Sequence, residues 1–240
     1  MCFHVQQIPK EKIKVGKNII QLNTNHQNLI KNYYTVSGFA FPWLFVVSNQ
    51  NPCEISLMQW GLIPFWVKTE QQAKEIRTNT LNAKCETLFS KPAFRCAAYR
   101  RCILPVNGFF EWHTIGKNKF PFFIEPKEEE YFLLAGIFDE WTNLHTGELV
   151  QTFSIVTIQA NKTLAYIHNS KQRMPLILTH EMADIWLEPN VSKRDLENLF
   201  VPYNDEKMSY HTISKLITSR IENNNVPEVT AIFEYPELNL

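Results

Sequence analysis

Glycine is scarce in this chain, and its scarcity argues against one common kind of binding site. Only 7 of the 240 residues are glycine, so a glycine-rich loop that cradles phosphates with backbone amides is not expected. An excess of charge is also missing, because 24 basic residues balance 24 acidic ones. A neutral chain has no global attraction for nucleic acid, so any polyanion site must be a local patch.

Long apolar runs and paired cysteines are absent as well. No stretch reaches the ~18 apolar residues of a membrane span, and no apolar run follows a basic start as in a signal peptide. The five cysteines form no C-x-x-C motif, and their odd number favours reduced thiols over a disulfide framework or a zinc site. These absences predict a cytoplasmic protein with no metal or cofactor.

Apolar and aromatic residues are plentiful, at 45% and 13% of the chain, which is enough for a substantial core. Strands are predicted at residues 44–47, 54–60, 102–112, 120–124, 131–141, 150–157, 175–178 and 210–213. Helices are predicted at residues 69–77, 86–89, 161–168, 180–187 and 193–200. Residues 6–34 give only a weak signal. Without a regular βαβ rhythm, repeat or linker, the pattern predicts one α+β domain with a mainly antiparallel sheet.

The chain begins Met1-Cys2-Phe3-His4, a start with chemical consequences. An initiator methionine is removed when the next residue is small, and cysteine is small enough, so the mature chain would carry an α-amine and a thiol on one residue. The amine titrates near ~8 and the thiol near ~8.5. Such an aminothiol can condense with an aldehyde through its amine and close a five-membered ring through its sulfur. The alternative is an ordinary cysteine behind a start codon.

Three further polar residues interrupt apolar or structured segments. Glu111 lies in Gly-Phe-Phe-Glu-Trp, where desolvation would raise its pKa and suit it to proton transfer near neutrality; alternatively, it faces outward from a strand. Asn82 can both donate and accept hydrogen bonds, or can cap a helix near Glu86. His168 can shuttle protons, or can be a structural residue at a helix end.

Basic and aromatic residues are interleaved in a way that is typical of a groove for single-stranded nucleic acid. The basic members are Arg77, Lys84, Arg95, Arg100, Arg101 and Arg173, and the aromatic members are Trp43, Trp60, Phe65 and Trp66. A run of charge is more often a solvated face, and the net charge of zero supports that alternative.

Six segments of the chain closely resemble the SRAP family, the SOS-response-associated peptidase or abasic-site processing proteins. They occur in the family's order and span nearly the whole chain. The segments are Met1-Cys2, Trp-Gly-Leu-Ile-Pro-Phe-Trp at 60–66, Asn-Ala-Lys-Cys-Glu-Thr at 82–87, Pro-Val-Asn-Gly-Phe-Phe-Glu-Trp at 105–112, Ala-Gly-Ile-Phe-Asp-Glu-Trp at 135–141, and Ile167-His168 with Arg-Met-Pro at 173–175.

The resemblance implies a single, barrel-like SRAP domain over residues 1–240. It further implies binding of single-stranded DNA and a covalent thiazolidine crosslink between Cys2 and the ring-opened aldehyde of an abasic site, with weak lyase activity as a side reaction. Cys2 would be the nucleophile, and Asn82, Glu111 and His168 match the family's active-site residues. A monomer is expected, because no motif suggests an oligomer interface.

The resemblance and the basic and aromatic pattern together predict a set of DNA contacts: His4, Pro42, Trp60, Phe65, Trp66, Arg77, Lys84, Arg95, Arg100, Arg101, Thr157 and Arg173. The chain departs from the family at several of its own positions. Phe3-His4 replaces the usual Gly-Arg, Lys84 keeps the charge of a common arginine without its bidentate fork, and four residues separate His168 from Arg173.

Two other classes of function use the same residues. In the first, Cys2, His168 and Glu111 form a thiol peptidase that removes the residues ahead of Cys2. In the second, the protein is a non-catalytic module for single-stranded DNA. A covalent product with abasic DNA distinguishes the crosslinking enzyme from both.

Overall fold

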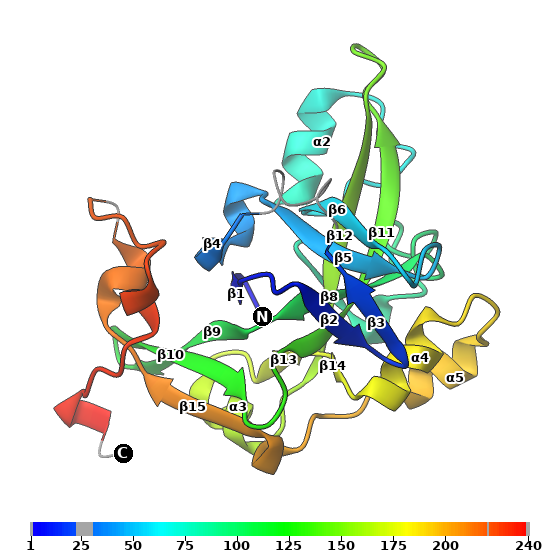
Figure 1. Cartoon of the computed structure of the whole chain (residues 1–240). Coiled ribbons are helices and arrows are strands. Elements are labelled where there is room, and N and C mark those ends of the chain that lie inside the picture. The colour runs from blue at the N-terminus through cyan, green and yellow to red at the C-terminus, as the bar shows by residue number, and fades with distance from the viewer. Residues whose placement is uncertain (1, 23–30, 220, 239–240) are drawn as a thin grey trace.

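Five strands close into a β-barrel at the centre of the molecule (Figure 1). The structure is a computed structural model that describes residues 2–22, 31–219 and 221–238. The barrel pairs its strands in the order β12, β6, β5, β8 and β11, and β11 pairs with β12 to close the ring. All these pairings are antiparallel except that between β12 and β6. The barrel strands are β5 (Trp43–Ser48), β6 (Ile55–Trp60), β8 (Arg101–Val106), β11 (Phe132–Thr142) and β12 (Leu149–Gln159).

Three short strands extend this barrel sheet: β7 (Asn82–Lys84), β13 (Arg173–Pro175) and β14 (Ile177–Leu178). A second, five-stranded antiparallel sheet has the order β15-β10-β9-β1-β4. Its strands are β1 (His4–Gln7), β4 (Tyr33–Ser37), β9 (Gly108–Ile115), β10 (Asn118–Pro126) and β15 (Met208–Thr212). The strands β2 (Lys12–Val15) and β3 (Asn18–Gln21) form a separate hairpin. The predicted α+β class with a mainly antiparallel, barrel-like sheet is confirmed.

Helices occupy the outside of the sheets, and each begins at a polar cap. They are α2 (Glu70–Arg77), α3 (Lys162–Ile167), α4 (His180–Leu187) and α5 (Lys193–Asn198), with short 3-10 turns such as η1 (Gly38–Ala40) and η2 (Cys85–Thr87). The side chains of Thr69, Asn161, Thr179 and Ser192 accept hydrogen bonds from the first turns of the four α-helices. None of the described helices is both long and apolar enough to cross a membrane.

Most predicted elements form where the sequence places them, and the exceptions have physical causes. The segment 102–112, predicted as one kinked strand, forms two strands that belong to different sheets and are separated by Asn107. The backbone N–H of Asn107 donates to the carbonyl of Gln6 at 3.0 Å, which turns the chain from one sheet into the other. Strands also form in the region 6–34, where the sequence pattern gives only a weak signal. Residues 23–30 of that region lie outside the residues that the structure describes.

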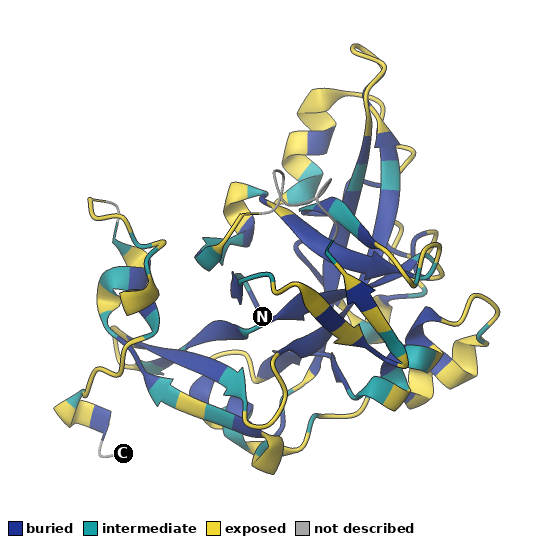
Figure 2. Cartoon of the chain, in the orientation of Figure 1, coloured by how far each residue is buried: buried dark blue, intermediate teal, exposed yellow. Residues whose placement is uncertain are grey.

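Burial follows the barrel strands, which are dark blue in Figure 2, whereas much of α2 and of the C-terminal segment is yellow. The N-terminal strand is tied into this buried region. Gln7 is 1% exposed, and its side chain donates to the carbonyls of Phe45 at 3.0 Å and Pro105 at 2.9 Å. Its oxygen accepts from the N–H of Phe45 at 3.1 Å. One buried amide therefore joins β1 to two barrel strands, because a buried polar group is retained only where it is satisfied.

A close approach between β9 and β10 generates a stability prediction. A Cβ atom on Gly108 would lie 2.4 Å from the ring of Phe123 and 2.6 Å from the carbonyl oxygen of Ile124. We expect Gly108→Ala to lower the free energy of unfolding by about 3 kcal/mol or more, because the backbone contact cannot relax by a rotamer change. Gly116→Ala is the control: a Cβ there meets nothing within 4 Å, so it should cost only about 1 kcal/mol for its left-handed backbone. Equal losses in urea unfolding would contradict the packing argument.

Candidate active site

The start of the described chain lies between two strands that carry predicted site residues. Strand β1 pairs with β9 with His4 opposite Phe110, so the residue after Phe110, which is Glu111, lies beside the start of β1. Strand β7 begins at Asn82, and its side-chain amide donates to the carbonyl of Cys2 at 2.9 Å. Residues 80 and more positions apart in sequence therefore meet at Cys2.

The Cys2 thiol is wholly buried, and its environment keeps it protonated. Its exposed fraction is 0%, and Sγ donates a weak hydrogen bond to the carbonyl of His4 at 3.8 Å. Burial and then the nearby carboxylate of Glu111 raise the pKa of the thiol far above its ordinary value. A thiolate is therefore not the resting form of this side chain in the folded chain.

Glu111 faces inward, so the outward-facing alternative is wrong. The residue is 3% exposed and lies on β9 opposite Phe122 of β10. Burial raises the pKa of its carboxyl from 4.5 to about 7. A carboxyl with this pKa is present in both protonation states near neutrality, which suits it to donate and accept a proton in turn.

His168 ends α3 as its C-cap residue and also faces Glu111. Its Nδ1 lies 3.0 Å from the carbonyl oxygen of Arg173 and 3.7 Å from Oε1 of Glu111. Because a carbonyl only accepts, Nδ1 is assigned the proton, which leaves the lone pair of the neutral ring on Nε2. Burial lowers the pKa of His168 to about 4, so the imidazole is neutral at pH 7 and can accept a proton.

Asn169 anchors this histidine, a role that no sequence pattern indicated. Its side-chain nitrogen donates to the carbonyl of Thr114 at 2.9 Å, and its oxygen accepts from the N–H of Thr114 at 3.1 Å. This two-point contact imitates a strand pairing and fixes the segment after α3 against β9, three residues beyond Glu111. The backbone N–H of Gln172, at a positive φ of 51°, then returns to the carbonyl of His168 at 2.8 Å.

Asn82 has one hydrogen-bonding atom available to a ligand. Its residue is 9% exposed, and its Oδ1 is buried with no hydrogen-bond partner among the described residues. The alternative role as a helix cap is wrong, because Lys84 is the N-cap of η2 and Asn82 is paired with Cys2. An unsatisfied buried acceptor is costly, so a hydroxyl or amine donor from a substrate would be favoured there.

Three of the predicted basic contacts are instead committed to the protein. Arg101 is 0% exposed and donates to the carbonyls of Trp186 at 2.7 Å and Glu188 at 2.5 Å. Arg100 pairs with Asp139, and Arg173 pairs with Glu86. The guanidinium of Arg173 also donates to the carbonyl of Thr157 at 2.6 Å. Charge alone could not show that Arg101 and Arg173 are buried, whereas 41% of the Arg100 side chain remains exposed.

Arg77 is placed differently, over an aromatic ring and without a carboxylate. Its guanidinium carbon lies 3.9 Å from the centroid of Phe41, and Nη2 reaches the carbonyl of Trp60 at 3.4 Å. In the described part of the chain no acidic side chain forms an ion pair with Arg77. Burial lowers its pKa to about 10, so it remains charged at neutral pH. Lys84 and Arg95 are exposed.

The other predicted DNA contacts divide into exposed and buried residues. Phe65 and Trp66 are 54% and 45% exposed. Pro42 and Thr157 are buried, and Trp60 is 0% exposed with its indole N–H on the carbonyl of Leu81 at 2.9 Å. These three therefore shape the site from inside and offer no open face for a base.

His4 brings no positive charge to this region. Burial lowers its pKa to about 4, and its ring meets the edge of Trp112 with centroids 5.1 Å apart. The position is thus neutral at physiological pH, unlike the arginine that usually stands there in the resembled family.

Asp139 is a second site-supporting residue that sequence reasoning missed. It is 1% exposed, accepts from the N–H of Phe65 at 2.9 Å and pairs with Arg100. It thereby holds the turn that exposes Phe65 and Trp66. An acid inside the otherwise apolar segment Ala-Gly-Ile-Phe-Asp was the signal that could have found it.

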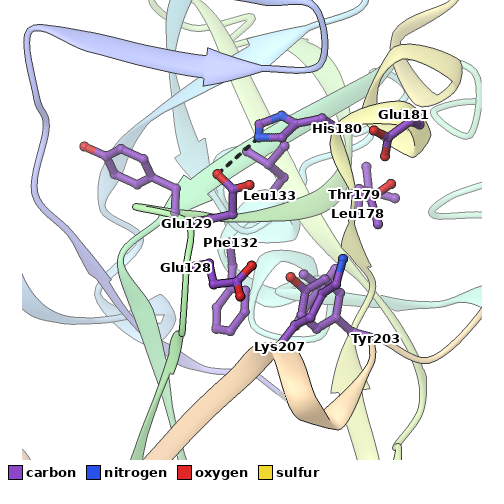
Figure 3. Close-up of a pocket in the computed structure, with 12 residues that line it drawn as sticks. Glu128, Glu129, Phe132, Leu133, Leu178, Thr179, His180, Glu181, Tyr203 and Lys207 are labelled. Atoms are coloured by element: carbon purple, nitrogen blue, oxygen red, sulfur yellow. Dashed lines mark hydrogen bonds and ion pairs between the residues drawn. The ribbon is translucent and has the colours of Figure 1, made fainter.

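A cavity of about 130 Å³ lies elsewhere in the molecule (Figure 3). Its walls include Glu128, Glu129, His180, Tyr203 and Lys207, and none of its lining residues belongs to the predicted site. Within the described residues, no cluster of three or more histidine, cysteine or acidic side chains could hold a metal ion.

Comparison with known proteins identifies the family to which the chain belongs. A family model described as SOS response associated peptidase (SRAP) matches residues 1–220. The abasic site processing protein YoaM of Bacillus subtilis is 35% identical over 179 residues, which cover 73% of this chain and 75% of that protein. The abasic site processing protein HMCES of Gallus gallus is 32% identical over 193 residues, 71% of this chain and 55% of that protein.

A solved structure of a protein from Bacteroides thetaiotaomicron has the same fold. It superposes with a TM-score of 0.86 at 36% sequence identity, covering 97% of this chain and the whole of that one. The family model and these similarities lead to one conclusion: the chain belongs to the SRAP family.

Proposed function

We propose that the mature chain, beginning at Cys2, captures abasic sites in single-stranded DNA as a covalent thiazolidine. The observation that carries the proposal is the convergence of Cys2, Asn82, Glu111 and His168, which come from four separate segments. Relatives named for abasic site processing support DNA with abasic sites as the partner. The chemistry requires removal of Met1, because only then is the Cys2 nitrogen an amine.

The first step is attack of the Cys2 amine on the open aldehyde. The thiol is held protonated by burial, so the amine is the first nucleophile. Neutral His168 accepts the proton lost from the amine and returns it to the aldehyde oxygen, which gives the carbinolamine. Protonated Glu111 then donates to the hydroxyl of the carbinolamine, which leaves as water. The product of this step is an iminium ion between Cys2 and C1′ of the sugar, beside the carboxylate of Glu111.

The second step closes the ring. The Cys2 sulfur adds to the iminium carbon, its proton returns to the carboxylate of Glu111, and the thiazolidine forms without loss of further atoms. The Oδ1 of Asn82 accepts a hydrogen bond from the sugar or the amine and orients it. Holding all groups in one place replaces a collision in solution, an effect worth up to about 7–11 kcal/mol in ideal cases.

The DNA strand is proposed to bind through the exposed and half-buried residues of the predicted set. Arg77, Lys84 and Arg95 take the phosphates, and Phe65 and Trp66 stack on bases. The imine also acidifies the neighbouring C2′ hydrogen, so slow β-elimination is a side reaction of the same intermediate.

Replacing the nucleophile tests the covalent step. Cys2→Ala keeps the terminal amine but has no sulfur to close the ring, so no adduct should survive denaturation without a reductant. Denaturing gels with an oligonucleotide that carries one abasic site measure the adduct. Cys102→Ala, at another buried cysteine, is the control and should crosslink normally. A stable adduct in Cys2→Ala at the wild-type level would contradict the mechanism.

Glu111→Gln tests proton transfer, because the amide keeps the shape but carries no transferable proton. We expect crosslinking to slow by about a hundredfold or more. With a pKa of about 7, the protonated fraction of Glu111 falls as pH rises through 7, so the wild-type rate should lose this contribution above pH 7. The variant should lack this part of the pH profile. An unchanged rate and profile would mean that Glu111 is not the acid.

Arg77→Gln tests the phosphate contact through its salt dependence. Each phosphate neutralised on a single strand contributes about −0.7 to the slope of log K against log salt concentration. We expect the variant to bind more weakly and its slope to be shallower by about 0.7, as measured by fluorescence anisotropy. Arg101→Gln is not a suitable control, because its side chain is structural; Lys215→Gln, at an exposed lysine in the C-terminal segment, should leave the slope unchanged. An unaltered slope in Arg77→Gln would remove it from the phosphate path.

The peptidase alternative predicts a different product from the same residues. Expressed in cells without methionine aminopeptidase, a self-processing chain loses Met1 in the wild type and retains it in Glu111→Ala. A chain processed only by the host retains Met1 in both. Intact mass spectrometry separates the two outcomes, and a binding module without chemistry gives no covalent adduct in either case.

A further inference from the structure

Beside Cys2, an aromatic pair that belongs to neither predicted set stands partly in solvent. The rings of Phe3 and Phe39 are 5.0 Å apart between centroids and inclined by 36°. Phe39 is 53% exposed, and Phe3 packs on the main core with part of its surface open. Packing in the core therefore accounts for only part of the Phe3 side chain, and it does not account for an exposed aromatic ring at Phe39.

The pair is fixed to the nucleophile by the backbone. The N–H of Gly38 donates to the carbonyl of Phe3 at 2.8 Å, and the N–H of Phe39 is capped by the side chain of Ser37. Gly38 is required there, because an added Cβ would lie 3.1 Å from the buried ring of Trp60. Figure 1 draws this turn after β4, near the start of the chain. Because Phe3 follows Cys2 directly, the ring pair lies one residue from the reacting amine.

A cation lies over a third ring of the same segment. Phe41, two residues beyond Phe39, carries the guanidinium of Arg77 over its ring. Gly61 packs against both, since a Cβ there would lie 3.0 Å from Phe41 and 3.3 Å from Cβ of Arg77. An exposed aromatic face followed by an unpaired guanidinium matches the order of groups along a nucleic-acid strand, in which a base and a phosphate alternate.

The lesion itself explains why such a face is needed. An abasic nucleotide has no base, so stacking can hold the strand only through the bases on either side of it. Phe65 and Trp66 belong to a different turn, held by Asp139. The aromatic face of Phe3 and Phe39 is the one that adjoins Cys2 in the chain.

We propose that Phe3 and Phe39 form a stacking subsite for the nucleobase adjacent to the abasic site. This inference rests on the proposed function, since the reacting sugar must lie at Cys2. Phe39 is the contacting ring, and Phe3 supports it and couples its position to the nucleophile. The subsite recognises any base, because every base offers a π-face.

The test measures equilibrium binding to an oligonucleotide with a tetrahydrofuran in place of the abasic sugar, which cannot react. A second oligonucleotide has tetrahydrofuran also at both flanking positions, so that the neighbouring bases are missing. Phe39→Ala should bind the first about five- to a hundredfold more weakly than wild type, and the second within twofold of wild type. Phe39→Trp should keep wild-type affinity for both, and Phe39→Leu, which is apolar without a π-face, should behave like Phe39→Ala.

Two further readouts separate stacking from general damage. The salt slope of Phe39→Ala should equal that of wild type, because the lost contact is uncharged. Phe233→Ala, which removes a ring that is 47% exposed in the C-terminal segment, is the matched control and should bind both oligonucleotides normally. Equal weakening of Phe39→Ala on both oligonucleotides, or none on the first, would overturn the subsite.

The outcome is distinguishable from failure of the proposed function. If wild-type protein binds the unreactive oligonucleotide but never crosslinks to one with a true abasic site, the covalent chemistry fails. If wild type crosslinks and Phe39→Ala weakens binding to the two tetrahydrofuran oligonucleotides equally, or weakens binding to neither, the subsite alone fails.

Discussion

The hydrogen bond from the Asn82 side chain to the carbonyl of Cys2 is the constraint on which the site depends. Chain ends are ordinarily mobile unless they are tied down, and a reactive terminal residue is of little use if it moves. Here β1 fixes the direction of the chain by pairing with both β9 and β4. The side chain of Asn82 holds the backbone at Cys2. The barrel matters to the chemistry because it supports the strand that carries Asn82, which pairs with β12.

Burial also shifts the pKa values of two neighbouring titratable groups in opposite directions. The same desolvation that raises the pKa of Glu111 to about 7 lowers that of His168 to about 4, because it disfavours the charged form of each. The result is a neutral base beside an acid that is half protonated near neutrality.

The positions of most strands and helices could be predicted from the sequence, whereas the contacts made by each charged side chain could not. Periodicity placed strands such as 54–60 and the helix 69–77 correctly, because their patterns are local. The kink at Asn107 was predicted, but the passage into a second sheet was not, since it depends on a hydrogen bond to Gln6 of that sheet. Arg101 looked like a phosphate contact, yet it satisfies backbone carbonyls near Trp186. Trp60 looked like a stacking face, yet it lies under Gly38.

Roles that arise only from tertiary contact left little trace in the sequence. The two-point clamp of Asn169 on Thr114 joins segments 55 residues apart, and neither residue stands out alone. Phe39 was indistinguishable from a core residue until its exposure was known. Resemblance to the family supplied the identity of the proposed site residues. The structure adds which neighbouring side chains already bond to protein groups and which remain open to a ligand.

The most direct measurement of the central claim is the mass and chemistry of the protein–DNA product. A thiazolidine at Cys2 predicts a mass equal to the mature protein plus the oligonucleotide minus one water. It also predicts that, after proteolysis, the N-terminal peptide carries the sugar and that neither its amine nor its sulfur reacts with an alkylating reagent. A product that needs borohydride to persist, leaves the Cys2 thiol open to alkylation, or attaches at a lysine would contradict the account.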